Sequence, residues 1–168
     1  MKYAVALAFL GAAFLSAQTE NPDLKPLGFL EGTWDAKTQQ GTAGAAASGT
    51  YTFVKELGGH ILARHTTTAD CKGPASYDCD HGDLLYVYPE GATLKAIYFD
   101  NEGHVIHYNV AASDPNSVVF LSDAAIPGPQ VRLAYERKGA VMSGKFQMRM
   151  PGETAWKPYL EWSGSKQR

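Results

Sequence analysis

The sequence has little charge of either sign and no basic cluster. Only 19% of its 168 residues are charged, and 15 basic against 17 acidic residues give a formal net charge of −2. No stripe or tail of Lys and Arg is present, and binding to a polyanion depends on such clusters. We therefore predict that the protein has no nucleic-acid partner.

The motifs of common enzyme classes are also missing. There is no G-x-S-x-G, no phosphate-binding glycine loop and no dinucleotide fingerprint. The glycine-rich stretch Gly41–Gly49 lacks the lysine and the following helix that phosphate binding needs. Acidic residues are plentiful, but the sequence places no two of them across a scissile bond. We therefore predict no catalytic residue and no cofactor, and we favour a protein that is not an enzyme.

Long apolar runs are absent except at the start of the chain. Lys2 precedes the apolar run Ala4–Leu15, and Ser16-Ala17-Gln18 follows it. The run is shorter than the ~20 residues that a membrane span needs, and its flanks are typical of a secretory signal peptide. We predict a signal peptide over residues 1–17, with an uncleaved anchor as the alternative. One domain over residues 18–168 is then periplasmic or secreted, with no remaining membrane span.

Only two cysteines are present, Cys71 and Cys79. Export places them in an oxidising compartment, so we predict a disulfide that closes a small loop around Gly73-Pro74. Two free thiols or a metal site are the alternatives, and four polar neighbours are candidate ligands: Asp78, Asp80, His81 and Asp83. Acidic residues clustered beside glycine are typical of a solvated loop, so no metal site is predicted.

What the sequence does contain is a series of short strand-like segments joined by Gly, Pro, Asn and Asp turns. Ten segments fit between Thr33 and Lys166: one opening at Thr33, one from Gly49, and then His60–Ala69, Leu84–Tyr88, Thr93–Asp100, His104–Ala112, Ser117–Ser122, Gln130–Lys138, Ala140–Arg149 and Trp156–Lys166. No connection is long enough for the helix that a parallel crossover requires, so every pairing should be antiparallel.

An antiparallel meander of this length hides its edges by closing. We predict an all-β fold, a single antiparallel up-and-down β-barrel of about ten strands. A short helical turn within Asn21–Glu31 should precede it, and Gln39–Ser48 should form a loop or a marginal helix. Pro158 should mark a bulge or an edge in the last strand, because proline cannot donate to a strand ladder.

Alternation within the strands suggests which side chains face inward. In the eighth strand Val131, Leu133 and Tyr135 share a face, and Phe146 and Met148 do so in the ninth. Tyrosine offers an apolar ring and one hydroxyl, which suits a pocket for an amphipathic molecule, although ordinary core packing is the alternative. The predicted ligand-binding residues are Tyr51, Phe53, His65, Tyr86, Tyr98, His107, Tyr135, Phe146 and Met148.

Histidine pairs do not suggest a metal centre. His104 and His107 are three residues apart, and His60 and His65 are five apart, so each pair projects to opposite faces of a strand. A hydrogen-bonded or exposed histidine is the alternative to a cavity-lining role for His65 and His107.

The stretch Leu27-Gly28-Phe29-Leu30-Glu31-Gly32-Thr33-Trp34 carries a family resemblance. It resembles the Gly-x-Trp opening of the calycin superfamily, which includes lipocalins, fatty-acid-binding proteins and nitrobindin-like barrels. The pattern L-x-x-L-x-G-x-W before a strand meander is most similar to a bacterial family of secreted, lipocalin-like proteins of unassigned function. The resemblance implies that Trp34 is structural and plugs one end of the barrel.

Ten strands favour the fatty-acid-binding or nitrobindin geometry over the eight-stranded lipocalin. Nitrobindin-like barrels bind haem through a histidine near the C-terminus, but this chain has no histidine after His107. The resemblance therefore implies no haem here.

We predict that the barrel binds a small hydrophobic or amphipathic molecule in its interior. Two alternatives remain open at this stage. One is an isomerase or hydrolase of hydrophobic compounds that uses the same cavity. The other is a structural or interaction module whose barrel is filled by its own side chains. The sequence leaves the oligomeric state undetermined.

Overall fold

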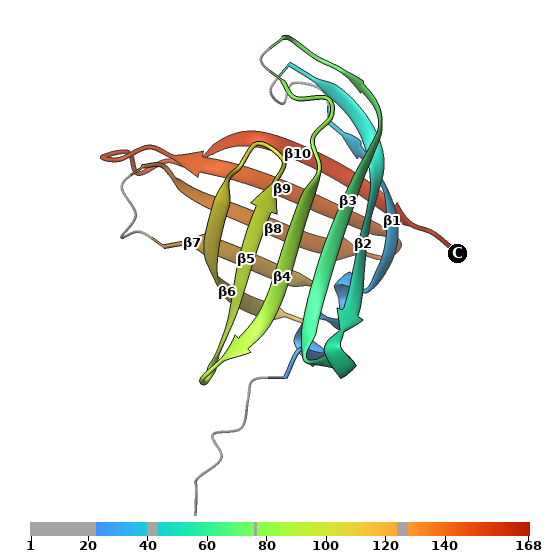
Figure 1. Ribbon diagram of the computed structural model, residues 1–168, viewed down its shortest axis with the longest axis vertical. Coiled ribbons are helices and arrows are strands. Elements are labelled where there is room, and N and C mark those ends of the chain that lie inside the picture. Colours follow the sequence, from blue (N-terminus) through green and yellow to red (C-terminus); the bar gives the residue numbers. More distant parts are fainter. Residues whose placement is uncertain (1–22, 40–43, 76, 124–127) are drawn as a thin grey trace, which may run out of the picture.

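A closed barrel of ten antiparallel strands forms the protein (Figure 1). The computed structural model describes residues 23–39, 44–75, 77–123 and 128–168, and the predicted signal peptide over residues 1–17 lies outside them. Each strand pairs with its neighbours in sequence, and β10 pairs with β1. The strands are β1 Gly32–Thr38, β2 Ala46–Glu56, β3 Ile61–Lys72, β4 Asp83–Glu90, β5 Thr93–Asp100, β6 Val105–Asp114, β7 Ser117–Ser122, β8 Gln130–Lys138, β9 Val141–Arg149 and β10 Lys157–Lys166.

The predicted all-β barrel of about ten strands is confirmed, and so is the bulge near Pro158. The register of β9 and β10 shifts between Pro158 and Leu160. The loop or helix predicted over Gln39–Ser48 is wrong in its last part, because β2 begins at Ala46 and pairs with the end of β3. Figure 1 shows these two strands projecting beyond the barrel rim. A second register shift lies at Ser48/Gly49, where a Cβ on Gly49 would lie 2.2 Å from the Thr67 carbonyl oxygen.

A short 3₁₀ helix, η1 (Lys25–Leu30), lies at one end of the barrel (Figure 1). Proline at its start fits a position that needs no backbone N–H. Its apolar residues Leu27 and Leu30 are fully buried, and the Trp34 indole Nε1–H donates a 2.8 Å hydrogen bond to the Leu30 carbonyl oxygen. A second 3₁₀ turn, η2 (Leu57–Gly59), joins β2 to β3 at this same end. We call this end the closed end.

Because the strands alternate in direction, the connections that follow β1, β3, β5, β7 and β9 all lie at the opposite, open end. The predicted disulfide between Cys71 and Cys79 is present there, with the two Cα atoms 5.4 Å apart. It ties the end of β3 to the segment that precedes β4. Within the described ranges, no helix has the length and apolar character needed to cross a membrane.

Truncating the closed-end indole should destabilise the barrel strongly. Trp34 is 1% exposed and stacks on Tyr51, with ring centroids 6.4 Å apart. We expect Trp34→Ala to lower the free energy of unfolding in urea by about 3–5 kcal/mol, because it leaves a large cavity and an unpaired carbonyl. Trp156→Ala is the control, since Trp156 packs only partly buried beside Arg132 on the outside. We expect that variant to lose about 1–2 kcal/mol, and equal losses would contradict a closing role for Trp34.

Candidate functional site

The interior of the barrel is filled toward the closed end and hollow toward the open end. Fully buried side chains occupy the closed half, among them Phe53, Leu62, Val87, Phe120 and Met142. Toward the open end lies a cavity of about 720 Å³. Cavities of roughly 300–1,000 Å³ are typical of small-molecule sites. The interior therefore has room for a small organic molecule.

Most of the cavity wall is apolar. Ala36 on β1, Ile106 on β6 and Leu133 on β8 line it together with Phe146 and Met148 on β9. Successive residues of a strand point to opposite faces, so the apolar residues face the lumen and the polar ones face outward. Leu133 follows the polar Arg132 in this way on β8, and Met148 follows the polar Gln147 on β9. Such a wall favours ligands that gain by leaving water.

Glycines at two inward positions make room for aromatic rings on neighbouring strands. Gly144 on β9 pairs with Trp162 on β10, and a Cβ on Gly144 would lie 2.0 Å from the indole Cε2. A Cβ on Gly164 would lie 3.0 Å from the Tyr51 hydroxyl. Each ring thus approaches the wall at a place where a side chain on the neighbouring strand would collide with it.

A buried ion pair lies at the inner side of the cavity. Arg64 on β3 is 5% exposed, and its Nη2 donates a 2.5 Å hydrogen bond to Asp83 Oδ1 on β4. Arg64 Nη1 donates to the Tyr135 hydroxyl, and the Thr66 hydroxyl donates to Asp83 at 2.8 Å. The Arg64 guanidinium on β3 is therefore held in place by Asp83 on the neighbouring strand β4 and by Tyr135 on β8.

Both members of this pair are charged at neutral pH. Burial alone would raise the pKa of Asp83, but the Arg64 guanidinium and the His81 hydrogen bond outweigh it and lower that pKa to about 2. Burial opposes the charge on Arg64 as well, yet Asp83 and then Tyr135 raise the pKa of Arg64. The two charges neutralise each other inside the barrel.

Several polar atoms at the cavity wall have no hydrogen-bond partner among the described residues. They are the hydroxyls of Tyr51 and Tyr108, Arg64 Nε and Trp162 Nε1. Burial raises the pKa of both tyrosines, so both remain protonated. The nearby Trp162 N–H opposes the rise in the pKa of Tyr51, although the two atoms do not meet the geometry of a hydrogen bond. A buried donor without a partner costs free energy unless a ligand supplies an acceptor.

At the open end, His81 links the buried ion pair to the rim. Its Nε2 lies 3.1 Å from the Tyr98 hydroxyl and 3.4 Å from Asp83 Oδ2, and its Nδ1 lies 3.1 Å from Glu102 Oε1. The hydrogen bond to Asp83 raises the pKa of His81 most, burial opposes it, and Glu102 adds to the rise, which brings the pKa to about 9. The rim is therefore a second polar region.

The structure brings most of the predicted ligand-binding residues together. Five of them line the cavity: Tyr51, Tyr98, Tyr135, Phe146 and Met148. Phe53 lies deeper, 1% exposed, with its ring centroid 5.4 Å from that of Tyr135 in an edge-to-face contact. Phe53 therefore supports the cavity floor from below rather than facing the open space.

His65, Tyr86 and His107 lie on the outer face of the barrel. His65 Nε2 is 3.1 Å from Glu56 Oε1, and its ring meets the Tyr86 ring edge-on at 6.5 Å. Tyr86 faces outward because Leu85 and Val87, on either side of it in β4, are fully buried. His107 is exposed.

Sequence reasoning did not select Arg64, Tyr108 or Trp162, which all line the cavity. Tyr108 and Trp162 each lie on a strand face that alternation identifies as apolar, so that pattern contained the information needed to find them. No such pattern identifies Arg64 as inward-facing. A guanidinium is buried only when it has an acidic partner, and the partner of Arg64 lies on another strand.

Comparison with protein-family models and with curated proteins gave no match for this chain. The observed ten-stranded antiparallel barrel is compatible with a calycin-like fold.

Breaking the buried ion pair between Arg64 and Asp83 should destabilise the folded protein. Asp83 is 9% exposed, so Arg64→Met leaves its carboxylate without the guanidinium in a poorly solvated place. We expect the free energy of unfolding in urea to fall by about 3–5 kcal/mol. The double variant Arg64→Met/Asp83→Leu removes both charges and should recover much of this loss. A loss below about 1 kcal/mol for the single variant would show that water screens the pair.

Proposed function

We propose that this protein binds a small, mainly apolar and uncharged molecule in the open half of its barrel. The observation that carries the proposal is the cavity of about 720 Å³ inside a barrel whose other half is solidly packed. A barrel that served only as a structural module would gain stability by filling this space with larger side chains. Ala36 is small at a position where a larger residue would narrow it.

The ligand should be uncharged, because the interior already balances its own charges. Asp83 neutralises Arg64, so an anionic ligand would have to compete with a carboxylate held by three hydrogen-bond donors. A cationic ligand would meet the guanidinium at close range. Moving an unpaired charge out of water into such a site is strongly unfavourable.

The unpaired wall atoms suggest the polar part of the ligand. Arg64 Nε and Trp162 Nε1 can only donate, and the Tyr108 hydroxyl can donate or accept. These atoms are shielded from solvent in this structure, so a carbonyl, ether or hydroxyl oxygen on the ligand would pair with one of them only after neighbouring side chains shift. Affinity would come mainly from apolar area: roughly 400 Å² of it removed from water contributes about 10 kcal/mol before the costs of association.

The protonation states favour binding over acid–base catalysis. A general acid or base works best when its pKa lies near the ambient pH. The pKa of Asp83 is lowered to about 2 and that of His81 is raised to about 9, so both move away from neutrality. Ion-paired groups that hold a structure together shift their pKa values in this way too.

We further propose that the protein acts outside the cytoplasm, as a member of a secreted, lipocalin-like group of calycin barrels. The signal-like run at residues 1–17, the Gly-x-Trp opening and the Cys71–Cys79 disulfide support this placement. The ligand would then be a molecule met in the periplasm or the medium.

Filling the cavity should weaken the binding of an apolar probe. Ala36 lines the cavity, and both of its cross-strand neighbours, Gly49 and Gly164, are glycines. We expect Ala36→Phe to weaken binding of the neutral fluorescent probe N-phenylnaphthylamine by at least about tenfold, a loss of about 1.4 kcal/mol or more. Ala111→Phe is the matched control, because Ala111 is exposed on the outside of β6. Equal affinity of the two variants would show that the probe binds outside the cavity.

Ligand charge should matter as much as ligand shape. Anilinonaphthalene sulfonate resembles N-phenylnaphthylamine but carries an added anionic group. Because the Arg64 charge is already neutralised by Asp83, we expect the neutral probe to bind at least about tenfold more tightly, as measured by fluorescence titration. Tighter binding of the sulfonate would contradict an uncharged ligand and would indicate that Arg64 is available to anions.

A further inference from the structure

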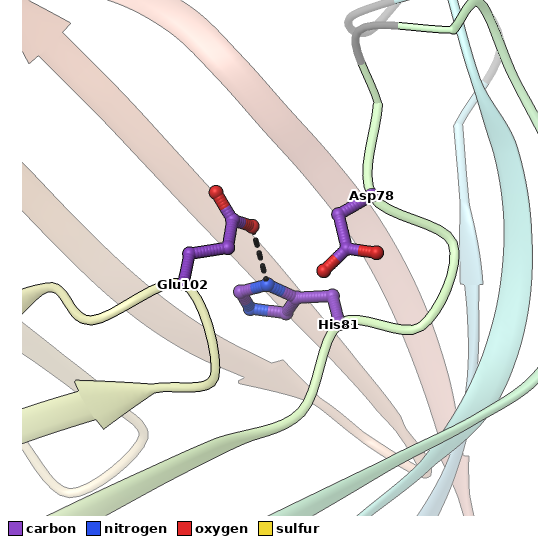
Figure 2. Close-up of side chains that lie close together, drawn as sticks. All are labelled: Asp78, His81 and Glu102. Carbon is purple, nitrogen blue, oxygen red and sulfur yellow. Dashed lines mark hydrogen bonds and ion pairs between the residues drawn. The ribbon is translucent and has the colours of Figure 1, made fainter.

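Three potential metal ligands converge at the open end of the barrel. Asp78, His81 and Glu102 each offer one ligand atom, and these atoms all lie within 4.8 Å of one another. Figure 2 shows both carboxylates above the imidazole ring, that of Glu102 to the left and that of Asp78 to the right. His81 Nδ1 lies 3.1 Å from Glu102 Oε1. Asp78 and His81 come from the segment before β4, and Glu102 comes from the β5–β6 turn.

Asn101 fastens these two segments to each other. Its side-chain Nδ2 donates to Asp78 Oδ2 at 3.3 Å and to the Asp80 carbonyl at 3.1 Å. Its Oδ1 accepts from the Gly82 N–H at 3.0 Å, and its own backbone N–H donates to the Gly82 carbonyl at 3.1 Å. The disulfide at Cys79 lies immediately beside Asp78. The three ligands are thus positioned by a linked pair of loops rather than by free surface side chains.

The far side of the imidazole is held by a buried carboxylate. His81 Nε2 faces Asp83 Oδ2 at 3.4 Å and the Tyr98 hydroxyl at 3.1 Å, and that hydroxyl donates to Asp100. When Nε2 carries the proton, the lone pair of Nδ1 is free to face Glu102 Oε1. A metal-bound histidine usually has this arrangement, with its second nitrogen donating to a carboxylate.

We propose that Asp78, His81 and Glu102 bind a divalent transition-metal ion of the zinc type at the mouth of the barrel. Ligands about 2.1 Å from a tetrahedral zinc ion lie about 3.4 Å from one another, and the 3.1 Å between His81 Nδ1 and Glu102 Oε1 is close to that spacing. One imidazole and two carboxylates form a ligand set that zinc accepts. Three protein ligands leave a fourth position for water or for a ligand atom at the cavity rim.

The same three residues also permit a metal-free state. A proton on Nδ1 would make the His81–Glu102 contact an ordinary ion pair, and ion and proton would compete for the same nitrogen. A second histidine–carboxylate pair serves for comparison. His65 Nε2 and Glu56 Oε1 are also 3.1 Å apart on the outer wall, but no third ligand joins them among the residues that the structure describes.

Calorimetric titration of the untagged, chelator-treated protein with Zn²⁺ alone tests the proposal. We expect one site, with binding weakened at least about tenfold by Glu102→Gln and by Asp78→Asn. His65→Gln should bind Zn²⁺ like the unchanged protein. Glu102 is exposed in a turn, so its variant should fold normally. A crystal soaked in Zn²⁺ should show an anomalous peak between these three side chains.

Two results would overturn the proposal. One is the absence of Zn²⁺ binding, which would leave His81 and Glu102 as an ion pair only. The other is binding that Glu102→Gln and Asp78→Asn leave unchanged, which would locate the ion at other surface histidines. Because this titration contains no organic ligand, its outcome is independent of whether the cavity binds one.

Discussion

Pairing of the first strand with the last is the constraint on which the rest of this molecule depends. Trp34 to Thr38 on β1 pair with Lys166 back to Trp162 on β10, and this pairing closes the sheet that the ten described strands form. Once the sheet is closed, every strand has one face inside and one face outside. The alternation of each strand then fixes which side chains meet in the lumen, so the cavity and its polar wall follow from closure.

Much of the fold was predictable, because turns and alternation are local properties. Three predicted strands, Thr93–Asp100, Ser117–Ser122 and Gln130–Lys138, have the observed bounds, since Gly, Pro, Asn or Asp residues delimit them. The start of β2 was not predictable in this way. Ala46 and Ala47 have weak strand propensity, and they become extended because they pair with Lys72 and Cys71 of β3.

The site was predictable only where one face of a strand was clearly polar. On β4 both faces are apolar, so sequence alone could not show that Leu85 and Val87 face inward and Tyr86 outward. On β10 the bulge between Pro158 and Leu160 interrupts the alternation before Leu160, while Leu160 and Trp162 still share one face. The contacts of Arg64 and of Glu102 join residues distant in sequence, and no spacing rule reports such contacts.

Asp83 connects the two parts of the open end. Its Oδ1 accepts hydrogen bonds from Arg64 and Thr66 within the barrel, and its Oδ2 faces His81 at the rim. A change at Asp83 would therefore disturb the cavity wall and the rim histidine together. Ala36 lies outside the metal cluster, so a change there tests ligand binding alone, whereas Glu102 belongs to the cluster and also lines the cavity at its rim. If both occur, this carboxylate is the physical route by which one would influence the other, because it bonds to groups in each.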